Sequence, residues 1–247
     1  MQARTDILQW KAHIPRSINQ EAAKQDQLEM ITNNPNYALI VMDWAMKFLQ
    51  LKYREKQSDW YGKRGLSWHI STVISNDPDK EGSLELQSYA HLFDTCQQDW
   101  FAVCSIIENT LETIKTQKPH VTQVYLRSDE AGCYHNNSLI AAAKHIGQRV
   151  GITVCRYDYS EPQYGKDVCD RILCPMKTCI RRYCNEGHDI LRAADMRRAL
   201  SERQVKGTSA CVCVVDETKK TLDVKKVEGF SKLHNIQFEV KGIRVWR

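Results

Sequence analysis

Acidic residues at three places in the sequence are spaced so that they could hold a divalent metal together. Asp43 closes one apolar run, Asp129 follows another, and Asp167 and Asp170 lie one helical turn apart further along the chain. Two carboxylates at neighbouring strand ends repel each other unless a cation lies between them, and oxygen ligands favour Mg²⁺ or Mn²⁺ over zinc. A third acid from a following helix would complete a two-metal site for in-line phosphoryl transfer. The pattern therefore predicts a metal site formed by Asp43, Asp129 and one of the two later acids.

The spacing of apolar residues predicts the elements that position these acids. Residues 39–43 form a continuous run of the kind found in central strands that are buried on both faces. Further strands are expected at 67–75, 84–93, 121–126 and 152–157, and helices at 97–118, 139–150, after 165 and at about 189–203. We expect Pro175 to kink or split the third of these helices. Residues just past strand ends line the ligand crevice of α/β sheets, which is where Asp43 and Asp129 are expected.

The order of these elements, β-β-β-α-β-α-β-α, predicts an antiparallel meander followed by strands that alternate with helices. This is the order of the RNase H-like fold. We therefore expect an α/β, RNase H-like mixed sheet with an N-terminal helix and a small C-terminal β extension. The expected division is a helical lead-in at 1–36, a catalytic-type core at 37–205 and an extension at 206–247 packed on the core. The short strands expected in the tail lie at 209–215, 221–227 and 236–245.

Basic residues are concentrated in one part of the chain. The whole sequence has 35 Lys and Arg against 30 Asp and Glu, and its net charge of +5 is too small by itself to indicate a nucleic-acid binder. Residues 1–120 carry a net charge of −2 and residues 121–247 one of +7, while the segment 171–206 alone carries +5. Such a segment is either a solvated helix face or a footprint for a polyanion. The residues that we expect to bind DNA are Lys166, Arg171, Lys177, Arg181 and Arg182.

The ten cysteines lack the spacing of a zinc site. No Cys-x-x-Cys pair is present, and cysteines spaced by five residues between 169 and 184 turn about 140° away from each other on a helix. Cys211 and Cys213 share one face of an expected strand and are expected in the core. The sequence shows no signal-peptide pattern and no apolar run of membrane length. We therefore expect a nuclear or cytoplasmic protein with reduced thiols, no zinc, no organic cofactor and no membrane partner.

Two motifs around the acids resemble those of known enzymes. The segment 128–136, SDEAGCYHN, resembles the second-aspartate motif of retroviral integrases and DDE transposases, and 161–170, EPQYGKDVCD, resembles the loop and helix that carry their third acid. The similarity of GKDxxD to a Gly-Lys-Gly-x-x-Asp motif of transposon-derived animal proteins favours Asp170 as the third acid, whereas integrase spacing fits Asp167 equally well. Residues 5–247 as a whole also resemble a group of transposon-derived animal proteins that often carry zinc-finger segments upstream.

The resemblance implies a transposon-derived, metal-dependent polynucleotidyl transferase or nuclease core acting on DNA phosphodiesters, either active as a DDE- or DDD-type enzyme or domesticated and inactive. In that mechanism Asp43, Asp129 and Asp170 hold two Mg²⁺ or Mn²⁺ ions. DNA is the expected partner, and a homo-oligomer is an open alternative. The alternative functions are a catalytically silent nucleic-acid-binding or chromatin-associated module, a cellular RNase H-type nuclease, and a protein-interaction domain.

Aromatic and histidine residues are weaker candidates for the same chemistry. The aromatic residues that could stack on bases are Trp44, Phe48, Trp60 and Trp68, although the core is the commoner place for such side chains. The histidines that could assist a metal site are His69, His135 and His188. Of these, His135 is favoured because it lies within the motif at 128–136.

Overall fold

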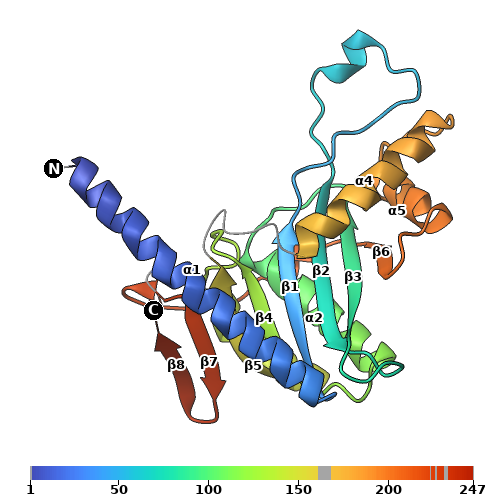
Figure 1. The fold of residues 1–247 in the computed structure, drawn as a ribbon. Helices are drawn as coiled ribbons and strands as arrows, with labels where there is room; N and C mark the ends of the chain where they lie inside the picture. Colours follow the sequence, from blue (N-terminus) through green and yellow to red (C-terminus); the bar gives the residue numbers. More distant parts are fainter. Residues whose placement is uncertain (1, 161–167, 223, 226, 231–232, 247) are drawn as a thin grey trace.

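A computed structural model describes residues 2–160, 168–222, 224–225, 227–230 and 233–246 of the chain. The structure is mixed α/β, with one eight-stranded sheet that has helices on both faces (Figure 1). After a long N-terminal helix the elements follow the order β-β-β-α-β-α-β-α, which confirms the order predicted from the sequence.

The elements have the following bounds. The strands are β1 (Tyr37–Trp44), β2 (Ser67–Asn76), β3 (Leu84–Phe93), β4 (Gln123–Asp129), β5 (Thr153–Ser160), β6 (Thr208–Val212), β7 (Asn235–Glu239) and β8 (Gly242–Trp246). The helices are α1 (Gln2–Asn33), α2 (Trp100–Gln117), α3 (Asn137–Val150), α4 (Val168–Asn185) and α5 (Ala193–Glu202), and short 3-10 helices lie at Gln57–Trp60 and Glu217–Lys219. Side chains of Asp99 and Asn136 cap the first turns of α2 and α3, and Gly151 ends α3 with φ of 82°.

The strands follow the order β6-β3-β2-β1-β4-β5-β7-β8 across the sheet. β1, β2 and β3 form an antiparallel meander, and β4 and β5 run parallel to β1. β1 is therefore a central strand, as its apolar run predicts. The C-terminal strands separate, because β6 pairs with β3 at one edge while β7 and β8 extend the sheet beyond β5 at the other.

Side chains of β1 alternate between two separate cores. Leu39 and Val41 belong to the core beneath α1, α4 and α5, whereas Ala38, Ile40 and Met42 belong to the core beneath α2 and α3. Helices therefore cover both faces of the sheet, and this arrangement buries β1 completely from Ala38 to Met42. None of the described helices is both long enough and apolar enough to cross a membrane.

Helix α4 differs from its expected form. It runs as one helix through Pro175, so the helix is not split there. A proline inside a helix removes one backbone donor and leaves the carbonyl group four residues earlier without its usual partner. Both Pro175 and Arg171 are exposed, so water can satisfy that carbonyl group and the helix continues.

The C-terminal region also differs from expectation. The described residues of 221–227 form no strand, because this segment passes beside α2, where Lys220 pairs with Asp99, and has no neighbouring strand. The single strand expected at 236–245 is the hairpin of β7 and β8. Cys211 and Cys213 lie on one side at the end of β6 with their Sγ atoms 3.3 Å apart, but they are half-buried at the sheet edge rather than in the core.

Helix α1 packs on the sheet through polar side chains. Gln20 and Gln27 are buried against the buried residues Arg127 of β4 and Asp158 of β5. Gln27 Nε2 donates to Asp158 Oδ2 at 2.6 Å, and Arg127 Nη1 donates to the Gln20 carbonyl oxygen at 3.2 Å. The other carboxylate oxygen of Asp158 accepts from Arg156 Nε at 2.6 Å. Burial raises the pKa of Asp158, and Arg156 and then Gln27 oppose that rise.

Replacing Gln27 with Ala should weaken this packing. We expect Gln27→Ala to lower the free energy of unfolding by about 1–3 kcal/mol, because a buried carboxylate loses a hydrogen-bond donor. Gln25→Ala is the matched control, since it removes an exposed bond to Glu21 and should cost less than about 0.5 kcal/mol. Urea denaturation measures both values, and equal losses for the two variants would contradict the assigned role of Gln27.

Two buried histidines lie between the sheet and α2. His69 of β2 pairs with His91 of β3, with ring centroids 6.0 Å apart, and His91 Nε2 lies 3.1 Å from Asn109 Oδ1. His69 Nε2 and His91 Nδ1 find no hydrogen-bond partner among the described residues. Burial holds the pKa of His69 well below its ordinary value and lowers that of His91 to about 4.

These histidines should make the protein sensitive to acid. Below about pH 6.5 the unfolded chain protonates both imidazoles, whereas folded His91 stays neutral down to about pH 4. The unfolded state therefore binds more protons, and the free energy of unfolding should fall by about 1.4 kcal/mol per pH unit for each histidine as pH falls through this window.

Urea denaturation at several pH values checks this expectation. His91→Gln should make the slope between pH 6.5 and 4 shallower by about one proton, whereas Gln25→Ala, which changes no titratable group, should leave it unchanged. An unchanged slope in His91→Gln would show that His91 is not held neutral.

Candidate active site

Asp43 is the next-to-last residue of β1 and is half-buried. Because side chains alternate along a strand, Asp43 has the same orientation as Val41, whose side chain lies in the core beneath α1, α4 and α5. Its place at the end of a central strand is the one predicted from the sequence.

The pairing of β1 with β4 brings the second acid to the same level. The two strands are parallel, and Val41 lies beside Arg127. The same register, continued for two residues, places Asp43 beside Asp129, the last residue of β4. Neighbouring strands lie about 4.8 Å apart, and residues at one level of parallel strands point to one face. The sheet therefore presents two carboxylates on adjacent strand ends and on the same side.

The charges of Asp43 and Asp129 both affect the pKa values of side chains in the segment that follows β4. Burial raises the pKa of Cys133 to about 11, and the charges of Asp129 and Asp43 both add to that rise. The fully buried Tyr134 also has a pKa well above its ordinary value, because of burial first and of the charge of Asp43 next. Both acids thus lie near this one segment, which agrees with the strand register.

The carboxyl group of Asp129 is partly desolvated by the protein around it. The residue is exposed, but the surrounding protein desolvates its carboxyl group and raises its pKa, and the charge of Glu130 adds to the rise. The backbone N–H of Ala131 donates to Asp129 Oδ1 at 3.0 Å and lowers the pKa. Desolvation and a like charge both disfavour the ionised form, and a bound cation would favour it.

The start of α4 lies over β1 close to these acids. Cys169 is buried, and its Sγ donates to the Val41 carbonyl oxygen at 3.3 Å. Asp170 is the next residue and is exposed in the first turn of α4. Asp167 lies outside the described residues. Within the part of the chain that the structure describes, no three His, Cys, Asp or Glu side chains are grouped as metal ligands.

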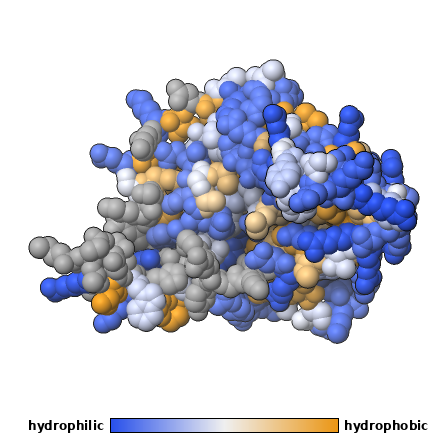
Figure 2. All heavy atoms as spheres, turned by 90° about the horizontal axis from the view of Figure 1, so that it is seen from above, coloured by the Kyte–Doolittle hydropathy of each residue, from blue (hydrophilic) through white to orange (hydrophobic). Residues whose placement is uncertain are grey.

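The expected DNA-binding residues are distributed along α4. Arg171, Arg181 and Arg182 are exposed, and Arg171 and Arg182 share one face because eleven residues make about three helical turns. Lys177 is half-buried, with Nζ 5.8 Å from the Trp68 ring centroid. Lys166 lies outside the described residues. Figure 2, which looks down on this end of the molecule, shows mainly hydrophilic residues on the α4 and α5 side.

Residues of the motif at 128–136 are held by the C-terminal region. His135 Nε2 donates to the Leu233 carbonyl oxygen at 3.0 Å, and the His135 ring lies 4.9 Å from that of Phe230. The Glu130 carboxylate also contacts Nδ1 of the His234 ring. Burial lowers the pKa of His135, so that it is favoured as a neutral group. These contacts engage His135 with backbone and aromatic groups rather than with the carboxylates.

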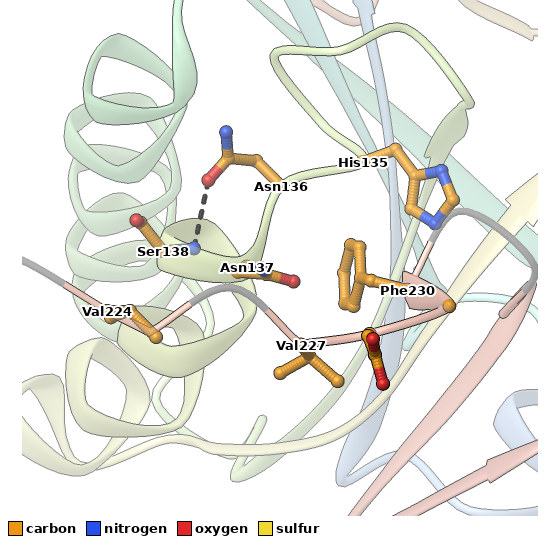
Figure 3. Close-up of a pocket in the computed structure, with 9 residues that line it drawn as sticks. His135, Asn136, Asn137, Ser138, Val224, Val227 and Phe230 are labelled. Atoms are coloured by element: carbon orange, nitrogen blue, oxygen red, sulfur yellow. Dashed lines mark hydrogen bonds between the residues drawn. The ribbon is translucent and has the colours of Figure 1, made fainter.

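A cavity of about 790 Å³ lies beside the same motif, between the start of α3 and Val224 with residues 227–230 (Figure 3). Asn136 caps α3 by accepting from the Ser138 backbone N–H at 2.9 Å, and Phe230 and Val227 lie across from it. Asn136 therefore has a role in ending the motif and starting the helix.

The remaining histidine and aromatic candidates lie in different parts of the structure. His69 lies on the face of β2 opposite to that of Asp43, and the exposed His188 stacks on Tyr183 at 4.1 Å. Phe48 and Trp68 are buried, and Trp44 is half-buried with its ring 5.0 Å from that of His69. Trp60 alone among the four aromatic candidates is exposed.

Sequence reasoning missed the residues that support the site from a distance in the chain. Glu130 and His234 are 104 residues apart, and Gln27 and Asp158 are 131 residues apart. A single polar residue within a helix or strand does not reveal its partner. The only local signal is an acid in the β5 sequence, where an apolar residue is expected on a covered face.

Comparisons with known proteins give a family and a distant structural likeness. Two solved structures of the human cytomegalovirus terminase nuclease domain, one Mn soaked and inhibitor bound and the other Mn soaked, are similar with TM-scores of 0.32. Their sequences are 10% and 8% identical to this chain, and the similarity covers 76% of this chain and 70% and 68% of theirs. At this TM-score the likeness carries no argument about function. No curated protein matches the sequence.

The family is shown by the sequence itself. A sequence model described as a domain of unknown function, DUF8701, matches residues 23–244, which run from the last third of α1 into β8. The chain therefore belongs to the DUF8701 family.

Proposed function

We propose that this chain is an RNase H-like, metal-dependent polynucleotidyl transferase or nuclease core that acts on DNA phosphodiesters. The observation that carries the proposal is the parallel pairing of β1 with β4, whose register, continued two residues beyond the Val41–Arg127 pair, would align Asp43 with Asp129. The resemblance of 128–136 and 161–170 to transposase and integrase motifs supports the same function and a transposon-derived origin.

The topology supports the RNase H-like assignment. The antiparallel strands β2 and β3 lie on one side of the central β1, and the parallel strands β4 and β5 lie on the other. The start of α4 then returns to β1, where Cys169 contacts the Val41 carbonyl group. This contact brings the first turn of α4 to β1, and the proposal assigns Asp170 in that turn as the third acid.

The donor set fits a hard divalent cation. Two carboxylates on one side of adjacent strand ends provide oxygen ligands, which Mg²⁺ and Mn²⁺ prefer. Asp43 and Asp129 would hold the metal, with Asp170 as the third ligand. When bound, such ions lower the pKa of an attacking water or hydroxyl and stabilise the leaving oxygen. The strands fix the carboxylates in register, and Arg171, Arg181 and Arg182 bind phosphates.

A catalytically silent nucleic-acid-binding module is the second candidate. The observation that favours it is the orientation of the first turn of α4. Cys169 is the residue that faces β1, and Asp170 is exposed beside it. The basic residues of α4 would serve such a module equally well, since phosphate binding requires no metal.

The proposal also covers the cellular compartment of the protein and the residues that form its catalytic core. All ten cysteines carry free thiols in the structure, which supports a reducing compartment, the nucleus or the cytoplasm. We assign the activity to residues 37–205, with 1–36 and 206–247 as additions to that core.

Substitution of the two aligned aspartates tests the proposal. Purified protein should nick supercoiled DNA with Mn²⁺, and Asp43→Asn and Asp129→Asn should each slow nicking by more than about a hundredfold, because each removes a charged ligand. Asp79→Asn, in the exposed loop between β2 and β3, is the matched control and should keep full activity.

A second measurement separates the two candidate functions. Mn²⁺ should raise the melting temperature of the wild type and of Asp79→Asn but not of Asp43→Asn. Salt-dependent DNA binding that is equal in all variants, with no nicking and no Mn²⁺ effect, would select the silent module. Preferential cleavage of an RNA–DNA hybrid would instead identify an RNase H-type nuclease.

A further inference from the structure

The connection between β1 and β2, residues 45–66, extends beyond the sheet at the end where Asp43 lies, and we call it the basic arm (Figure 1). It contains six Lys and Arg residues but only two Asp and Glu residues. Asp59 pairs with Lys52 at 3.2 Å and Glu55 pairs with Lys63, so both acids are used inside the arm. The exposed arm cations without an ion pair to any described residue are Lys47, Arg54, Lys56 and Arg64.

Three aromatic rings of the basic arm are exposed. Tyr53 is 42% exposed, Trp60 is 56% exposed and Tyr61 is 75% exposed. Lys63 Nζ lies 4.8 Å from the Trp60 ring centroid, and it also donates to the Gln50 carbonyl oxygen at 2.6 Å. The arm therefore contacts Trp60 through a cation over its ring and still leaves more than half of the residue exposed to solvent.

The base of the basic arm is fixed to the rest of the protein. Phe48 and Leu66 exchange backbone hydrogen bonds of 2.9 and 2.7 Å, and Leu51 and Ile190 exchange two of 3.0 and 2.7 Å. The Tyr53 backbone N–H also donates to an oxygen of Asp189 at 2.8 Å. The arm is thus anchored to the connection between α4 and α5, next to the end of the helix that carries Arg181 and Arg182.

We infer that the basic arm binds single-stranded DNA, with Trp60 and Tyr61 stacking on unpaired bases. The exposed cations of the arm and of α4 supply positive charge for phosphates. Exposed rings can stack only on bases whose faces are free, and in a duplex those faces are covered by neighbouring base pairs. The inference rests on the proposed function, because it names the form of DNA that the site receives.

Binding measured without a divalent metal tests the inference. Fluorescence anisotropy in EDTA follows the full chain binding to a labelled oligothymidine of about 12 nucleotides and to a duplex of equal length. Trp60→Ala and Tyr61→Ala should each weaken binding to the single strand about ten- to a hundredfold and binding to the duplex by less than about twofold. Trp10→Ala is the matched control, because Trp10 is 63% exposed but lies on α1.

A charge variant provides a second readout. Arg54→Ala combined with Lys56→Ala should weaken binding to both DNA forms and reduce the dependence of affinity on salt. The inference is overturned if Trp60→Ala binds the single strand as tightly as Trp10→Ala does, or if it loses single strand and duplex equally. If the wild type nicks DNA with Mn²⁺ but Trp60→Ala and Tyr61→Ala bind the single strand as the wild type does, only the inference about the basic arm is wrong. If the two variants lose single-strand binding in EDTA but the wild type does not nick DNA with Mn²⁺, only the proposed catalysis is wrong.

Discussion

The candidate site depends on the parallel pairing of β1 with β4 at the centre of the sheet. The register of this pairing, continued two residues beyond the Val41–Arg127 pair, would set Asp43 beside Asp129, although 85 residues separate them in the chain. Two ionised carboxylates that share one end of a sheet repel each other unless a cation lies between them. The desolvation that raises the pKa of Asp129 acts in the same direction. Desolvation and like charge both disfavour the ionised form of Asp129, and a bound divalent cation would favour it.

Both cores contribute to keeping β1 and β4 in register. β1 is buried on its two faces, so a slip by one residue would move apolar side chains such as Val41 and Met42 into the wrong core. On β4 and β5 the covering helix α1 contacts polar residues instead, through Gln27 and Asp158. Such a buried polar contact is favourable only when each partner is in position. The site is thus supported by apolar packing on one strand and by a hydrogen-bond network on its neighbours.

The C-terminal region joins the two edges of the sheet and contacts the motif that follows β4. β6 extends one edge beside β3, β7 and β8 extend the other beside β5, and the chain between them pairs Lys220 with Asp99 at the start of α2. His135 and Glu130 are then bound by the segment before β7. These contacts give the two residues of the motif a structural role. The carboxylate of Asp129 is left beside Asp43, and the basic arm and α4 lie at the same end of the sheet.

The sequence by itself determined the order of the elements, the central position of β1 and the places of Asp43 and Asp129 at strand ends. These features depend on local periodicity, which follows from the geometry of one strand or helix. Only the tertiary structure decided the separation of β6 from β7 and β8, the continuity of α4 through Pro175, and the exposure of Trp60 in contrast to Trp68. It also decided the partners of Gln27, His91 and His135. Pairing, burial and anchoring join residues far apart in the chain, and no local spacing encodes which distant neighbour a side chain will meet.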